Sequence, residues 1–302
     1  MATKTSQLGL TKPAYTDAAD IAVLNGNFYL IDKAVGNGKF VQNLLDNSFF
    51  PSAFVINQRG ASTYTAAGYA IDRWHLQNGT MTIGTSGITL TANADSNLRL
   101  MQYLEHLKNG TYTLAAKVNG EIKCRVVSYA DGTFTTINSS GAGYTGGYLD
   151  TGGTYVILRA NAGYTVNFEW AALYEGAYTP ETLPTYVYKG YAAELAECQR
   201  YYFTMPNDPF ANGQTIGVGN AALFSIQTPV ALRVNEPTLD LHGGSLTIRC
   251  NGADYPVTAV SQQGKTGCFV YFMAQAEGLP AKHACASYVT GGTSKVALSA
   301  DL

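Results

Sequence analysis

Apolar positions near the start of the chain recur at spacings of three, four, three and four residues, at Ile21, Leu24, Phe28, Ile31 and Val35. This spacing predicts an amphipathic helix with a heptad seam. Thr16 or Asp17 can cap the helix, and Gly36-Asn37-Gly38 ends it. We expect the seam to pack against the same helix of other copies. The alternative is packing on its own domain, and five seam residues do not distinguish a dimer from a trimer.

Between residues 40 and 180 the pattern changes to short alternating runs separated by Gly or Asn. Residues 112–118 and 122–127 are rich in apolar, Tyr and Thr side chains, and Asn119-Gly120 lies between them, which predicts a tight hairpin. Similar runs occupy 81–83, 88–91, 98–107, 155–159 and 165–170. Short strands with turns every 8–12 residues or so predict an antiparallel sandwich.

The second half begins with the densest helical stretch of the chain, residues 191–202, which follows Pro180 and Pro184. Strand patterns then return at 223–228, 245–250, 257–261, 268–273 and 295–302. The predicted fold is mainly β: a short N-terminal helix, an antiparallel jelly-roll sandwich, a linker helix and a C-terminal β-sandwich head. The corresponding ranges are 1–38, 39–182, 183–203 and 204–302.

The amino-acid composition argues against several classes of partner and binding site. Of 302 residues, 13% are charged, about half the usual level, whereas Gly (32) and Tyr (21) are abundant. The net charge of −2 argues against a nucleic-acid partner. We expect neither membrane insertion nor an export signal, because no long apolar run is present. The five cysteines are widely spaced without a CxxC pair, so we expect free thiols and no metal site: Cys124, Cys198, Cys250, Cys268 and Cys285.

Catalytic motifs are missing from the sequence. The four histidines have no motif around them, and no nucleophile elbow, HExxH or phosphate loop is present. The carboxylates Glu105, Asp131, Asp150 and Glu169 suit a glycosidase pair if the fold brings two of them together. With 21 acidic residues, such a set is not specific. We therefore expect a protein that is not an enzyme.

Six strings occur in an order that resembles tail-fibre, or receptor-binding, proteins of Firmicutes-type phages and prophages. They lie at residues 10–32, 57–74, 110–114, 173–180, 194–202 and 299–302, and the fifth reads Glu-Leu-Ala-Glu-Cys-Gln-Arg-Tyr-Tyr. The resemblance covers both ends and most of the first two thirds. The Ala172-Leu173-Tyr174-Glu175 string departs from the Gln-Leu-Glu that usually ends the jelly-roll module.

The resemblance implies a homotrimeric fibre of the virion tail, made in the host cytoplasm. Its N-terminus would dock on the tail baseplate, and its carbohydrate-binding-like jelly roll and head would adhere to host-surface glycans. No cofactor is implied, although such modules often hold a structural calcium. Two alternatives remain: a depolymerase of surface polysaccharide, for which no repeat of 20–50 residues is visible, and a bacterial lectin or adhesin.

Glycan recognition needs flat aromatic faces beside planar polar groups. Tyr129, Tyr144 and Tyr148 lie in glycine-rich, turn-like stretches, where we expect them to be exposed, and Trp170 is a fourth candidate. Ordinary packing is the alternative for all four. Trp74 is expected to anchor the core, and the adjacent Asp72 and Arg73 to pair with neighbours.

Overall fold

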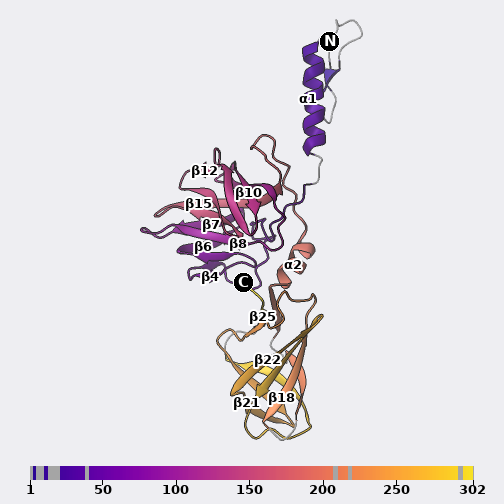
Figure 1. Cartoon of the computed structure of the whole chain (residues 1–302). Helices are drawn as coiled ribbons and strands as arrows, with labels where there is room; N and C mark the ends of the chain where they lie inside the picture. Colours follow the sequence, from indigo (N-terminus) through magenta and orange to yellow (C-terminus); the bar gives the residue numbers. More distant parts are fainter. Residues whose placement is uncertain are drawn as a thin grey trace.

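The computed structural model describes residues 3–4, 10–12, 21–37, 41–206, 210–216, 220–291 and 295–301. These residues are 50% strand and 8% helix, in antiparallel sheets, which confirms the mainly β prediction. Figure 1 shows helix α1 (Ile21–Asn37) at one end, then a proximal sandwich, helix α2 (Tyr191–Gln199) and a distal β unit.

Helix α1 covers the predicted seam, and it stands clear of both β units in Figure 1. The short strands β1 (Thr3–Lys4) and β2 (Thr11–Lys12) pair with each other. The side chain of Asn27 holds β2 against the helix, because it accepts a hydrogen bond from Thr11 N and donates one to Thr11 O, each 2.8 Å. The predicted caps and the side chain of Val35 lie outside the described residues.

The proximal sandwich consists of two antiparallel sheets. The larger has the order β11-β10-β9-β15-β7-β6-β3, and the smaller β12-β13-β14-β8-β5-β4. The larger sheet contains β3 (Thr63–Tyr64), β6 (Gly79–Gly84), β7 (Gly87–Ala92), β9 (Gly110–Val118), β10 (Glu121–Ala130), β11 (Thr133–Asn138) and β15 (Thr165–Glu175). The smaller contains β4 (Gly68–Tyr69), β5 (His75–Gln77), β8 (Leu98–Tyr103), β12 (Gly143–Tyr144), β13 (Gly147–Gly152) and β14 (Tyr155–Ala160).

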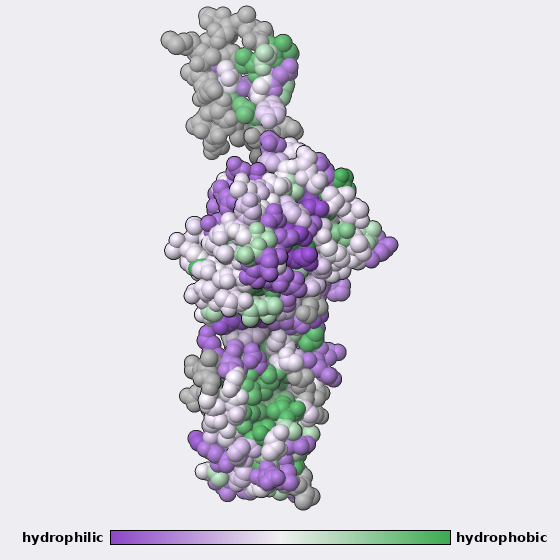
Figure 2. Space-filling model, turned by 90° about the vertical axis from the view of Figure 1, so that its left-hand side faces the viewer, coloured by the Kyte–Doolittle hydropathy of each residue, from purple (hydrophilic) through white to green (hydrophobic). Residues whose placement is uncertain are grey.

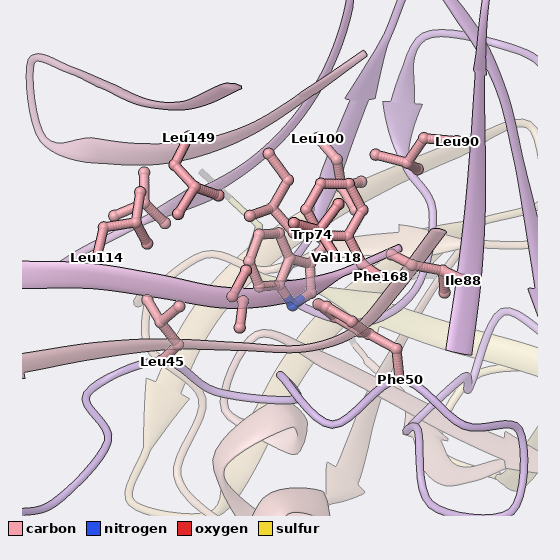
Figure 3. Close-up of a cluster of buried hydrophobic side chains, with 14 of the residues drawn as sticks. Leu45, Phe50, Trp74, Ile88, Leu90, Leu100, Leu114, Val118, Leu149 and Phe168 are labelled. Atoms are coloured by element: carbon pink, nitrogen blue, oxygen red, sulfur yellow. The ribbon is translucent and has the colours of Figure 1, made fainter. Parts of the chain in front are cut away.

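The core between these sheets surrounds Trp74, which is fully buried as predicted. Figure 3 shows its indole ring among Phe50, Leu100 and Phe168, with further leucines contributed by strands of both sheets. The indole Nε1 donates to the carbonyl of Asn47 at 2.9 Å, so the one polar atom of this large side chain is satisfied.

The turn residues between β9 and β10 determine the hairpin that these strands form. The β9–β10 hairpin turns at Asn119 and Gly120, with φ of 50° and 84°, as the sequence predicted. The strands at 155–160 and 165–175 also form, but they do not pair with each other. Strand β14 pairs with β13 and β8, whereas β15 pairs with β9 and β7. The connection between β14 and β15 therefore crosses from one sheet to the other.

The outer face of the larger sheet is covered as well. A second apolar cluster includes Cys124, Trp170, Tyr174 and Leu183, and the partly buried Phe49 and Tyr186 pack against it. The ring of Trp170 stacks on that of Tyr186 at 4.9 Å. The segment after β15 thus lies over this sheet, so that β15 is buried on both faces.

The distal unit contains a seven-stranded sheet of order β21-β20-β24-β17-β18-β23-β22 and a three-stranded sheet of order β16-β25-β19. The strands are β16 (Tyr202–Pro206), β17 (Ala211–Thr215), β18 (Ala221–Gln227), β19 (Thr238–Asp240), β20 (Ser245–Cys250), β21 (Ala253–Pro256), β22 (Ala259–Thr266), β23 (Phe269–Gln275), β24 (Ala284–Thr290) and β25 (Lys295–Ser299). Its core contains the stacked rings of Phe224 and Phe272.

One predicted boundary is wrong. The helix predicted to reach Tyr202 ends at Gln199, and Tyr202 instead begins β16. Strand β16 pairs along its length with β25, with Tyr202 opposite Ser299. These long-range backbone hydrogen bonds, which no local pattern reveals, satisfy the groups that a longer helix would have paired internally.

Candidate binding surfaces

The structure places two of the four predicted glycan residues away from solvent. Tyr129 is only 6% exposed, because the alternation of β10 turns it inward with Val127, against the ring of Phe134. The expectation that it is exposed is therefore wrong. Trp170 is also 6% exposed and lies beneath Tyr186. Neither ring presents a free face to a sugar in this structure.

Tyr144 and Tyr148 are half-buried and come together with charged side chains between the sheet edges. The hydroxyl of Tyr144 donates to the carbonyl of Arg159 at 2.6 Å, and the Arg159 guanidinium lies 4.5 Å from the ring centroid of Tyr148. Asp150 pairs with Arg159 at 2.9 Å and with Arg125 at 3.3 Å. Asp150 of the smaller sheet thus binds Arg125 of the larger sheet and Arg159 of its own sheet, although Arg159 Nε has no hydrogen-bond partner among the described residues. We interpret the cluster as a polar clasp between the sheets.

The four carboxylates considered for catalysis have separate partners. Glu105 pairs with Arg233 at 3.0 Å, and Glu169 with Lys117 at 2.6 Å. Asp131 accepts a hydrogen bond from Asn109, and Asp150 belongs to the clasp.

A groove of about 570 Å³ lies on the outer side of the larger sheet, beside the covered face. One wall comes from β10, β11 and the turn after β11, and the other from the segment after β15, which we call the strap (residues 176–181). Ten residues besides Gly141 line it: Cys124, Val126, Ile137, Asn138, Ser140, Ala177, Tyr178, Thr179, Pro180 and Glu181.

Hydrogen bonds to Thr113 and Thr111 of β9 fix the start of the strap. Gly176 N donates to Thr111 O at 2.8 Å, and the hydroxyl of Thr113 donates to Gly176 O at 2.8 Å while accepting from Tyr178 N at 2.9 Å. Gly176 has φ of 113°, and a Cβ there would lie 3.1 Å from the Tyr178 ring. Any other residue there would be strained, both by the positive φ and by its close approach to the Tyr178 ring.

The rest of the strap is a compact turn. Thr182 N donates to Thr179 O at 3.1 Å, and Thr179 N donates to the hydroxyl of Thr182 at 2.9 Å. The hydroxyl of Thr179 donates to the carboxylate of Glu181 at 2.7 Å, which lowers the pKa of that carboxyl group. Glu181 is therefore an anion at neutral pH.

The opposite wall is equally ordered. Ser140 N donates to Oδ1 of Asn138 at 2.8 Å, and Cys124 N donates to Gly141 O at 3.1 Å. Burial raises the pKa of the Cys124 thiol to about 12, so this cysteine is an apolar part of the wall rather than a nucleophile. Ile137 is 57% exposed at the groove.

Sequence reasoning missed this groove. Tyr178 and Pro180 were noticed only as part of the string that ends the module, and nothing local indicated that residues 137–141 face them. The available signal in the sequence is the pair Tyr178 and Pro180, which lies in a polar, turn-like segment directly after the long strand β15.

A second polar cluster joins the proximal sandwich to the distal unit, and we call it the joint. The guanidinium of Arg59 pairs with the buried Asp72 at 2.9 Å and with Asp301 of the distal unit. It also lies 3.8 Å from the ring centroid of Tyr202. Gln58 Nε2 donates to Tyr202 O at 2.6 Å. The prediction that Asp72 and Arg73 pair with neighbours is confirmed, since Arg73 binds Asp46 at 3.1 Å.

Tyr201 links the other side of the joint. Its ring centroid lies 3.5 Å from the Arg73 guanidinium, and its hydroxyl donates to Glu105 at 3.1 Å. Glu105 in turn pairs with Arg233 of the distal unit. Burial raises the pKa of Asp72 to about 7 and raises that of Asp301 as well.

Helix α2 is bound to the proximal sandwich by a buried carboxylate. Glu194 accepts a hydrogen bond from Asn47 N at 2.6 Å, and its desolvation raises its pKa. Cys198 on the same helix is fully buried. The string at 194–202 therefore forms contacts to both units and supplies no open site.

Among the described residues, no group of three or more His, Cys, Asp or Glu side chains is placed to hold a metal ion. The five cysteines are all free thiols. No helix in the described part of the chain is long and apolar enough to span a membrane. A comparison with protein-family models finds no match for the sequence, and a comparison with curated proteins finds no significant relative.

Proposed function

We propose that this chain is the subunit of a trimeric tail fibre of a phage or prophage, and that it adheres to host-surface glycans without catalysing a reaction. The observation that carries the proposal is the joint. It holds the proximal sandwich and the distal unit along one axis, and the apolar seam of α1 is exposed at the opposite end of the chain from the distal unit. Figure 2 shows the two units stacked along one axis with a narrowing between them.

The exposed seam of α1 supports assembly. Ile21, Leu24, Phe28 and Ile31 are exposed by 69, 46, 59 and 38% in the single chain. Green apolar residues are visible on this helix at the upper end of Figure 2. Most of the stability of a helix in a protein comes from packing of its apolar face, so burial of the seam against other copies would stabilise α1. Side-by-side copies would also present several equivalent weak sites, which raises avidity.

Adhesion is tested by incubating the full chain with cells of candidate hosts and measuring bound protein, with a reducing-sugar assay on their surface polysaccharide in parallel. We expect saturable binding to the cells and no release of reducing ends. Turnover of polysaccharide would overturn the adhesion-only proposal in favour of a depolymerase. If the trimeric protein binds none of the Gram-positive cells tested, the proposal of adhesion is wrong.

A further inference from the structure

We infer that the groove between the strap and the β10–β11 edge is the glycan site, and that it takes a neutral oligosaccharide. This inference rests on the proposed adhesive function and deepens it. The groove has about 570 Å³ of space, within the usual range of about 300–1,000 Å³ for small-molecule sites.

The lining has the two kinds of group that a sugar needs. Tyr178, Ile137 and Pro180 supply apolar surface for sugar C–H groups. Polar groups come from both walls: the amide of Asn138 on one side and the carboxylate of Glu181 on the other. Among the described residues, no hydrogen bond involves the Nδ2 group of Asn138, whose Oδ1 is held by Ser140. The described lining residues therefore include an amide group with two free donors and an ionised acceptor.

The charge of the lining decides the class of sugar. None of the described residues that line the groove is Lys, Arg or His, and the charged one among them is the anionic Glu181. Phosphodiester or uronate polymers would meet a like charge and no compensating cation, which disfavours them. A neutral hexose or N-acetylhexosamine can donate hydroxyl groups to Glu181 and accept hydrogen bonds from Asn138. It carries no charge that Glu181 would repel.

Hydrogen bonds within the chain hold both walls of the groove. The Thr111 carbonyl and the Thr113 hydroxyl hold the start of the strap on β9, and local hydrogen bonds hold the side chains of Asn138 and Glu181. A site whose polar groups are fixed beforehand loses little conformational entropy on binding. The clasp and Trp170 differ from the groove in what they leave open: Asp150 is paired with two arginines, and the ring of Trp170 is covered by Tyr186.

The test uses the full chain on an array of immobilised oligosaccharides. The neutral set contains glucose, galactose, rhamnose and N-acetylglucosamine oligomers, and the anionic set contains glycerol-phosphate and uronic-acid polymers. We compare Ile137→Glu and Asn138→Ala with the control Ile122→Glu. Ile122 is 39% exposed on β10 but does not line the groove.

We expect binding to neutral members of the array. Ile137→Glu and Asn138→Ala should weaken it about tenfold or more, as loss of one well-placed hydrogen bond or apolar contact does. Ile122→Glu should bind like the wild type, and all three variants should keep the wild-type unfolding temperature within a few degrees.

Three results would overturn the inference. If glycans bind and both groove variants bind like the wild type, the groove is not the site, although adhesion to glycans stands. If only anionic members bind, the charge argument is wrong. If no glycan binds while cells are still bound, both the groove and the glycan part of the proposed function fail together, and a protein receptor replaces them.

Discussion

At the scale of single residues, Arg59 contributes most to the joint. Its guanidinium contacts Asp72, Asp301 and the ring of Tyr202, so its single charge offsets part of the cost of burying two carboxyl groups. Both carboxyl groups still have raised pKa values, because desolvation outweighs the attraction of one shared cation. The joint is therefore a polar contact whose stability depends on protonation.

The pH dependence of this contact has a definite sign. With its pKa raised to about 7, Asp72 keeps a proton in the folded chain that the unfolded chain, with a carboxyl pKa of about 4, has released. Its contribution to stability is thus complete at low pH and is lost as the pH rises through 7. We expect the free energy of unfolding of the wild type to rise by about 1 kcal/mol per pH unit from pH 7 to 5, relative to Asp72→Asn.

Urea unfolding of both proteins at pH 5, 6 and 7 measures this difference. Asp72→Asn keeps a side-chain oxygen that can accept the hydrogen bond from Gln58 N, but it cannot ionise. The difference between the two proteins therefore reports the ionisation of Asp72 alone. Parallel pH profiles for wild type and variant would show that Asp72 does not titrate in this window.

At the scale of elements, two helices illustrate opposite cases. Helix α1 follows its heptad pattern and exposes it, whereas α2 is short and is defined by contacts to both units. The exposed apolar side chains of α1 make sense only if something covers them, since apolar area in water costs roughly 25 cal/mol per Å². We propose that other copies of the chain do so.

The seam is tested by Leu24→Glu combined with Phe28→Glu. We expect the mass in solution, measured by light scattering, to fall from that of a trimer to that of a monomer, because each copy would bring charges into the shared interface. The control is Tyr29→Glu, at a position 64% exposed on the same helix but off the seam. If the wild-type chain is already monomeric, or if the double variant stays trimeric, the proposal that the seam holds the copies together is wrong.

At the scale of the whole molecule, the joint determines how the distal unit sits on the proximal sandwich. Two ion-pair links, Arg59–Asp301 and Glu105–Arg233, cross between the units, and the rings of Tyr201 and Tyr202 lie against arginines between them. An adhesive protein gains from such stiffness, because a fixed spacing between sites lets several of them engage one surface.

Arg59→Ala should loosen this arrangement. The change leaves the buried Asp72 and the half-buried Asp301 without their cation. Loss of one partner costs about 3–5 kcal/mol in buried pairs. We expect separate unfolding transitions for the two units and a broader distribution of distances in small-angle X-ray scattering. Arg249→Ala is the matched control, because the Arg249–Asp254 pair is exposed in the distal unit. Identical scattering for Arg59→Ala and wild type would show that the joint does not depend on this residue.

The sequence alone determined what depends on near neighbours: the Asn119-Gly120 hairpin, a helix at the apolar seam, the burial of Trp74 and the mainly β character. Turn residues and apolar spacing act within a few positions, so a linear pattern contains them. Only the tertiary structure decided which sheet β14 and β15 join, that Tyr129 and Trp170 are covered, and that the strap faces residues 137–141. Arg59 and Asp301 lie 242 residues apart, and no local spacing encodes such a pair. Long-range contacts of this kind form because strand pairing and core packing bring distant segments together, and both the groove and the joint depend on them.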